Sequence, residues 1–263
     1  MMAATHRLEG HKLNPLIASL VVFLCLGTAA LAGMFFYASF RSQHRGDETT
    51  NVIRLVAGIF VVMTSLVLGL MLNTAKNRFD GVNRDVHAFA TELILLERNL
   101  RLYGPEADAS RERLKAYAEF VSKWKATSYD PTLISDPLSE DMLNHVGKAL
   151  RAISPPDSEH LALWNNARQD YERIVSLRWA VLQQSEGSIP VHMLVMVTCW
   201  LTMIFASFGY GAPRNAVVVI SLILAAALIA ATIDLILELD SPFYGSITMS
   251  PRPIQRVLDE MRR

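Results

Sequence analysis

Four long apolar runs constrain the fold of this chain more than any other feature of its sequence. They extend over about residues 15–40, 55–72, 191–212 and 216–239, and none of them contains Lys or Arg. The hydrocarbon core of a bilayer is ~30 Å thick, and an α-helix needs about 20 residues to cross it. Each run is therefore expected to form one membrane-spanning helix, which makes the chain an all-α membrane protein.

Short segments separate the runs within each pair, at residues 41–54 and 213–215. This spacing predicts two transmembrane hairpins with a central polar region between them. The expected division is an N-terminal hairpin over residues 1–72, a central helical domain over 73–188, a second hairpin over 189–240 and a tail over 241–263.

The first run leaves an alternative open. Arg7 and Lys12 precede it, and Ala30-Leu31-Ala32 imitates the cleavage site of a signal peptide. The apolar run continues as far as Tyr37, however, whereas the hydrophobic region of a signal peptide has only about 7–15 residues. A retained helix is the favoured interpretation, and N-terminal sequencing of membrane-extracted protein would decide.

The basic residues near the spans predict the orientation. With four spans, both termini and the central region share one side, and the flanks on that side carry the larger number of Lys and Arg. Such an excess marks the cytoplasmic side. The termini and the central domain are therefore expected in the cytoplasm, with the spans in the inner membrane.

The central region is expected to be helical throughout. Apolar residues recur at steps of three and four from Phe79 to Leu100, which is typical of an amphipathic helix. Further helices are predicted over about 107–125, 138–153 and 158–185. The first and last of the central helices are expected to be continuous, or nearly so, with the second and third spans.

No pattern in the sequence indicates catalysis or metal binding. The histidines are scattered and lack cysteine partners, and no Gly-rich phosphate loop or nucleophile elbow occurs. Cys25 and Cys199 both lie in predicted spans, where they are expected to act as small apolar side chains. The formal net charge of +0 gives no general attraction to nucleic acid. No cofactor, metal or enzymatic activity is therefore expected.

One face of the second span carries small and polar residues. Gly58, Ser65, Gly69 and Asn73 follow one another at steps of seven, four and four, with Arg54 and Lys76 near the two ends of the span. Such a face either packs closely on a neighbouring helix or lines a water-filled path. Both interpretations stay open at this stage.

The fourth span ends in acidic residues. Asp234 and Glu238 are four residues apart and share a helix face. Ionisable groups inside a span usually face protein or water. Both residues lie in the last two turns, so an interfacial position is the alternative, and Asp234 is the deeper of the two.

Four segments resemble a bacterial membrane-protein family described as bestrophin-like. They are "LNTAKNRFD" (72–80), "LILLERNLRLYGPEA" (93–107), "SIPVHMLVMVTCWLTMIFASFGYGAPRN" (188–215) and "LILELDSPFYG" (235–245). The resemblance implies four membrane helices per subunit, a cytoplasmic helical domain, and assembly into a homo-oligomer, a pentamer by analogy. It also implies that the second span lines an axial pore for small inorganic anions.

The resemblance further assigns roles to single residues. It makes Gly58, Ser65, Gly69 and Asn73 candidates for the pore lining, and Phe60, Val61 and Val62 candidates for its constriction. Asp240, Pro242, Phe243 and Gly245 are expected to form a structural turn after the fourth span. Animal bestrophins place acidic calcium ligands after this turn, whereas residues 246–250 here contain no carboxylate. We therefore expect no calcium gating through this turn, because calcium takes 6–8 oxygen ligands.

The leading hypothesis is an oligomeric anion channel in the bilayer, with Arg54 and Lys76 supplying positive charge at the pore mouths. The alternative is a non-conducting membrane scaffold or sensor whose cytoplasmic domain docks a partner. A third hypothesis is a transporter that binds an ion or proton at Asp234 and Glu238.

Overall fold

The structure is a computed structural model that describes residues 14–39, 47–123, 136–184, 189–210, 212–213, 215–241 and 252–262. All regular secondary structure in these ranges is helical. Four of the helices are long and apolar enough to cross a membrane. The all-α architecture with four candidate spans confirms the predicted fold class.

The spanning helices are α1 (Pro15–Ser39), α2 (Asp47–Tyr103), α7 (Val191–Gly209) and α8 (Ala216–Asp240). The main difference from the expected boundaries is in α2, which begins at Asp47, within the segment predicted to be a loop. The helix then continues for 57 residues as far as Tyr103. The predicted continuity of the second span with the first central helix is therefore present.

The third span does not continue the preceding helix in the same way. Helix α6 ends at Gln184, and α7 begins at Val191, directly after Pro190. A proline fits before or at the first turn of a helix, since it lacks the backbone N–H that an interior position needs. Pro190 therefore separates the two helices, and α7 is a span of its own.

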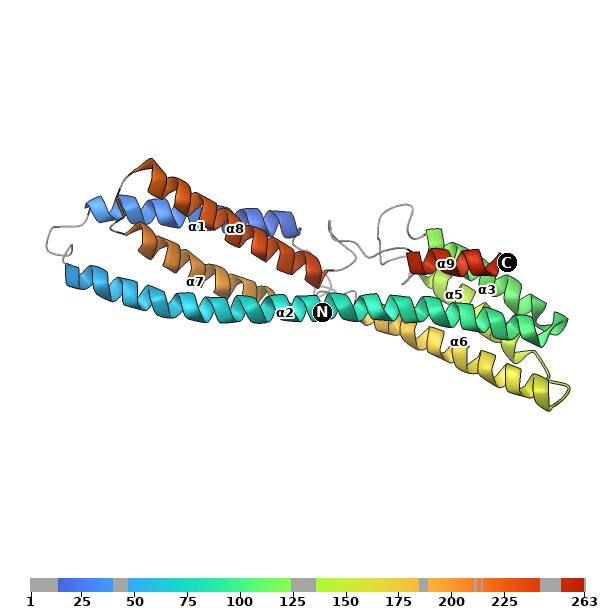
Figure 1. Ribbon diagram of the computed structural model, residues 1–263. Coiled ribbons are helices and arrows are strands. Elements are labelled where there is room, and N and C mark those ends of the chain that lie inside the picture. Colours follow the sequence, from blue (N-terminus) through green and yellow to red (C-terminus); the bar gives the residue numbers. More distant parts are fainter. Residues whose placement is uncertain are drawn as a thin grey trace, which may run out of the picture. The chain divides into compact units, whose positions relative to one another are not determined.

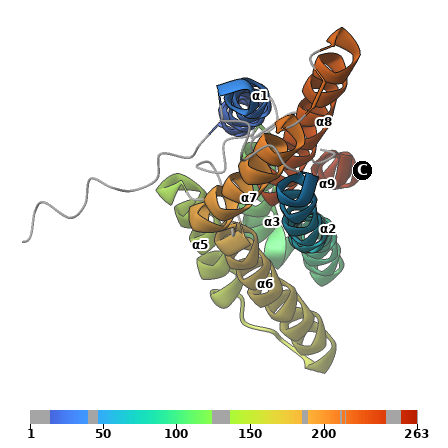
Figure 2. The same cartoon turned by 90° about the vertical axis from the view of Figure 1, so that its left-hand side faces the viewer.

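The chain forms two compact units. The first contains Met1–Lys76 and Ser188–Asp240, and the second contains Asn77–Gly187 and Ser241–Arg263. Helix α2 contributes residues to both. In the first unit, α1 packs along α7 and along α8 (Figures 1 and 2). Their buried faces join Met71 and Ala75 of α2 in one apolar cluster around Leu26, Val197 and Ile233. The pairing of consecutive spans into hairpins stays a prediction.

Helices α1 and α7 approach each other at backbone distance. A Cβ atom on Gly33 would overlap the backbone carbonyl of Ala206, and one on Gly209 would overlap the carbonyl of Ala30. Small residues that let two backbones come this close are common where membrane helices pack. The two glycines therefore fix the crossing of α1 and α7.

The second unit is a helical bundle. Besides the second half of α2, it contains η2 (Pro105–Ala107), α3 (Asp108–Lys123), α5 (Pro137–Arg151), α6 (Ser158–Gln184) and α9 (Arg252–Met261) (Figure 1). Its core is built around Leu93, Leu96, Leu114, Tyr117 and Ile174. The three central helices after α2 agree with the predicted ranges to within two residues at each described end. The end predicted for the first of these three, at about residue 125, lies outside the described residues.

Polar contacts set the register of α6 against α2 within this unit. Gln184 Nε2 donates to Asp85 Oδ2 at 2.7 Å, and Asn99 Nδ2 donates to Asp170 Oδ2 at 2.6 Å. Between α6 and α5, Trp164 Nε1 donates to the Leu150 carbonyl at 2.9 Å. Because buried polar groups cost free energy when they lose their partners, these pairs favour one alignment of the helices.

Helix α9 is absent from the expected elements, since the tail was treated as a segment without structure of its own. Its apolar residues Ile254, Val257, Leu258 and Met261 follow the three- and four-residue spacing of an amphipathic helix. Ile254 and Val257 are buried in the core of the second unit, and α9 packs against α3. Residues 252–261 of the tail are therefore part of the bundle.

Candidate functional site

Seven residues of α2 lie on one face of the helix. They are Arg54, Gly58, Val62, Ser65, Gly69, Asn73 and Lys76, at steps of four, four, three, four, four and three. With about 3.6 residues per turn, such steps keep side chains on a single face. We call this face the α2 stripe.

Among the described residues, nothing covers the α2 stripe. All seven residues are exposed, and no atom lies within 4 Å of a Cβ built on Gly58 or Gly69. The opposite side of the helix, at Ala57, Thr64, Met71 and Ala75, is buried. The glycines of the stripe therefore do not serve packing inside one copy of the chain, in contrast to Gly33 and Gly209.

The three constriction candidates occupy different positions around α2. Val62 belongs to the stripe, and its side chain is 61% exposed. Phe60 precedes it by two residues, which places it about 160° away around the helix. Its ring is half-buried, with its centroid 6.4 Å from that of Trp200 on α7. Val61 is exposed at the border of the stripe. Of the three, Val62 is aligned with the small residues.

A basic residue lies at each end of the α2 stripe. Arg54 lies one turn before Gly58, and Lys76 lies three residues after Asn73. Both are exposed, and the apolar segment between them contains no charged residue. The face therefore has a cationic end, a neutral centre of small residues with one valine, and a second cationic end.

The acidic residues of α8 have separate environments. Asp234 is half-buried, and its Oδ1 atom is buried without a hydrogen-bond partner among the described residues. Glu238 is buried. Asp240 accepts a hydrogen bond from the backbone N–H of Ile189 at 3.1 Å, which ties the start of α7 to the end of α8. Pro242, Phe243 and Gly245 of the expected turn lie outside the described residues.

The described residues offer no candidate metal site, since nowhere in these ranges do three His, Cys, Asp or Glu side chains gather as ligands. The salt bridges of the second unit serve packing instead. Glu97 is buried and lies 3.0 Å from Arg111 Nη2 and 3.7 Å from Arg101 Nη2, joining α2 to α3. Glu92, which forms an ion pair with Arg173 at 3.5 Å, likewise joins α2 to α6.

The chain matches the family profile of the Bestrophin-like domain over residues 23–254. It belongs to the bestrophin-like family. Among solved structures, a point mutant of a bacterial bestrophin homolog from Klebsiella pneumoniae superposes with a TM-score of 0.64 and 12% identity, covering 93% of this chain and 99% of that one. At this identity the likeness shows a shared fold. No curated protein matches the chain.

Family membership and the four apolar helices make this bestrophin-like chain an integral membrane protein of a channel-type family. Sequence reasoning named Val62 as a constriction candidate but did not place it on the same face as the small residues. Its signal is present in the sequence, because it completes the four-four-three spacing that begins at Arg54. That spacing ties the small residues to both charged ends.

Proposed function

We propose that this protein assembles into a homo-oligomeric channel, with the α2 stripe lining an axial pore for small inorganic anions. The observation that carries the proposal is the stripe itself, whose small residues lie uncovered although Gly is costly inside a helix. Residues without side chains leave room for ions where several copies of one helix surround an axis. A pentamer is the arrangement expected by analogy with bestrophins.

The chemistry of the stripe suits anions. Arg54 and Lys76 raise the local concentration of anions at the two mouths. Between them, a ring of Val62 side chains forms the apolar constriction, and such constrictions gate by excluding water. The side-chain amide of Asn73 provides hydrogen-bond donors to ions that have passed it, whereas the Ser65 hydroxyl donates to the Val61 carbonyl at 2.8 Å.

The proposed setting is the inner membrane, with both termini and the second unit in the cytoplasm. The excess of Lys and Arg in the flanks of the spans supports this orientation. A reporter fused after Arg263 should be active in the cytoplasm, and a reporter active only outside it would reverse the orientation.

Anion flux into liposomes that contain the purified protein tests the proposal. We expect chloride and nitrate to pass, Val62→Trp to block them, and Met63→Trp to leave flux unchanged. Met63 is the matched control because it is exposed and lies about 100° away from Val62 around α2. An intact oligomer without flux for several anions would contradict the channel and favour the scaffold.

The buried oxygen of Asp234 favours a second candidate function, in which an ion or proton binds there during transport. Ionisable groups inside spans commonly mark ion or proton pathways. Asp234→Asn should then abolish proton- or cation-coupled transport while leaving assembly intact. If flux in the same liposomes is independent of a pH or cation gradient, this second function is excluded.

A further inference from the structure

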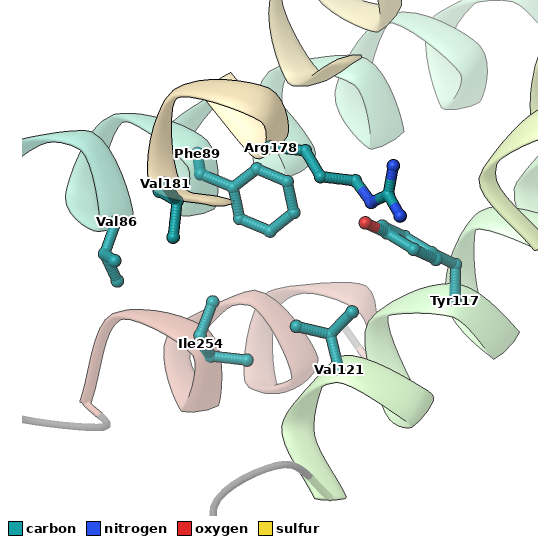
Figure 3. A pocket seen from close by; sticks show the side chains of 7 residues that line it. All are labelled: Val86, Phe89, Tyr117, Val121, Arg178, Val181 and Ile254. Atoms are coloured by element: carbon teal, nitrogen blue, oxygen red, sulfur yellow. The ribbon is translucent and has the colours of Figure 1, made fainter. Parts of the chain in front are cut away.

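Helices α2, α3, α6 and α9 of the second unit enclose a small cavity. It is lined by Val86, Phe89, Tyr117, Val121, Arg178, Val181 and Ile254 (Figure 3). The cavity holds about 20 Å³, in the measure in which a single water molecule needs roughly 10–15 Å³. It therefore has room for one particle of about the size of a water molecule or a halide ion.

The cavity has one polar end. Figure 3 shows the hydroxyl of Tyr117 beside the guanidinium of Arg178, while the remaining lining side chains are aliphatic or phenyl groups. Arg178 is only 3% exposed. Glu140 Oε2 lies 3.7 Å from its Nη2 atom. Because a guanidinium carries five N–H groups, it can face the cavity and keep other contacts at the same time.

Both polar groups at this end are hydrogen-bond donors. Burial raises the pKa of Tyr117 to about 12, so its side chain keeps its proton throughout the physiological range. The ring of Tyr117 is held edge-on to that of Phe89, with the centroids 6.4 Å apart. The hydroxyl therefore has a fixed position next to a buried positive charge.

This combination selects against most small occupants. A cation would be repelled by Arg178, and a water molecule would have to direct a hydrogen toward apolar side chains, which leaves it poorly satisfied. A halide ion accepts from both donors and has no hydrogen of its own. We propose that this cavity binds one halide-sized anion, chloride in the first instance, between Tyr117 and Arg178.

The proposed site lies in the helical bundle and is independent of conduction. An anion that binds the folded bundle and not the unfolded chain stabilises the folded state in proportion to the logarithm of its concentration. Since the site draws its walls from four helices, including the C-terminal α9, anion binding strengthens the closed bundle. The site can exist in a protein that conducts nothing, and a conducting pore can exist without it.

Crystals of the full-length protein in bromide test the position directly. We expect an anomalous difference peak beside the Tyr117 hydroxyl and the Arg178 guanidinium. A crystal in which the cavity contains only water, or no density, at high bromide concentration would overturn the proposal.

Thermal unfolding of the purified full-length protein provides the second test. At constant ionic strength, replacing gluconate with chloride should raise the Tm of the wild type by about 2–4 °C, the shift that ~1 kcal/mol produces in a chain of this size. In Tyr117→Phe, the rise in Tm that comes from chloride binding in the cavity should be absent. Tyr171→Phe is the matched control, since Tyr171 lies in the same bundle outside the lining.

A second variant covers the case in which Tyr117→Phe does not fold. Val121→Ile adds one methyl group to a residue of the cavity wall and leaves both donors in place. It should reduce the chloride-dependent shift while the Tm in gluconate stays within a few degrees of the wild type. If the cavity variants and the control all keep the full shift, the anion acts elsewhere, and the proposal is wrong.

Discussion

At the scale of single residues, Gly147 is tightly constrained by a side chain of a neighbouring helix. It lies in the middle of α5, and a Cβ there would overlap the ring and hydroxyl of Tyr171 on α6. Alanine is favoured over glycine in a helix by about 1 kcal/mol, but overpacking a tight core costs roughly 1–3 kcal/mol. We expect Gly147→Ala to lower the free energy of unfolding by up to about 2 kcal/mol, measured by chemical denaturation.

A double-mutant cycle separates this contact from a general effect on α5. In the Tyr171→Leu background the ring is gone, so Gly147→Ala should be neutral or stabilising there. An equal loss of stability in both backgrounds would show that Tyr171 is not the cause.

A second prediction at this scale concerns His160 and Asp157 at the start of α6. The side-chain hydrogen bond with Asp157, 2.8 Å from Nδ1, raises the pKa of His160 above its ordinary value of 6.5. The backbone N–H of His160 lowers the pKa of Asp157 below 3.8. The ring of His160 also packs edge-on against Tyr103, with the centroids 5.1 Å apart.

The directions of these shifts give the pH window. A raised His pKa stabilises the folded state below pH 6.5, and this contribution disappears as the pH rises through the higher folded pKa. A lowered Asp pKa stabilises the folded state above pH 3.8, and this contribution is lost as the pH falls through the lower folded pKa. The Tm difference between the wild type and His160→Gln should therefore be larger at about pH 5.5 than at about pH 8.5. A difference that does not change with pH would mean that the pair contributes only packing.

At the scale of elements, the crossing of α1 and α7 depends on two glycines that meet backbone atoms. Backbone cannot rotate away as a side chain can, so Gly33→Ala must push the two helices apart. We expect a loss of about 1–3 kcal/mol, seen as a lower Tm in detergent. Gly27→Ala on the same helix is the control, because no atom lies within 4 Å of its Cβ position. An equal loss of Tm in the two variants would show that the close approach of α1 and α7 does not cause the loss in Gly33→Ala.

The elements themselves were largely predictable from the sequence. Uninterrupted apolar runs give the spans, and the recurrence of apolar residues from Phe79 to Leu100 gives the helix below the second span. The start of α2 was placed too late because its first two turns are polar and hydropathy does not register them. Helix α9 was missed because ten residues with four apolar positions become a stable helix only when a core accepts them.

At the scale of the whole molecule, the sequence places the small residues on one face of α2 but cannot say what covers that face. Coverage depends on which side of α2 packs against the other spans, and that side carries Ala57, Thr64, Met71 and Ala75. The same limit applies to Phe60, whose apolar side chain is equally suited to a constriction and to a contact with Trp200. The cavity beside Arg178 was also hidden, because the residues that form it come from four separate helices.

The last prediction concerns the charges at the two ends of the α2 stripe. If several copies of the stripe surround one axis, each charge is repeated around it, and their potentials add where the ion enters. Lys76→Glu would convert a cationic mouth into an anionic one. We expect it to reduce chloride flux in liposomes several-fold at low salt and to shift the reversal potential toward cations, with Arg54→Glu acting at the other mouth.

Salt and a remote charge reversal provide the controls. Added salt screens charges beyond ~10 Å at 0.1 M, so the effect on flux should shrink as ionic strength rises. Lys115→Glu reverses another exposed lysine, which lies on α3 in the second unit and is not part of the stripe, and should leave selectivity unchanged. If Lys115→Glu and Lys76→Glu shift the reversal potential equally, the net charge of the protein sets selectivity. In that case the charged ends of the α2 stripe would not form the mouths of the pore.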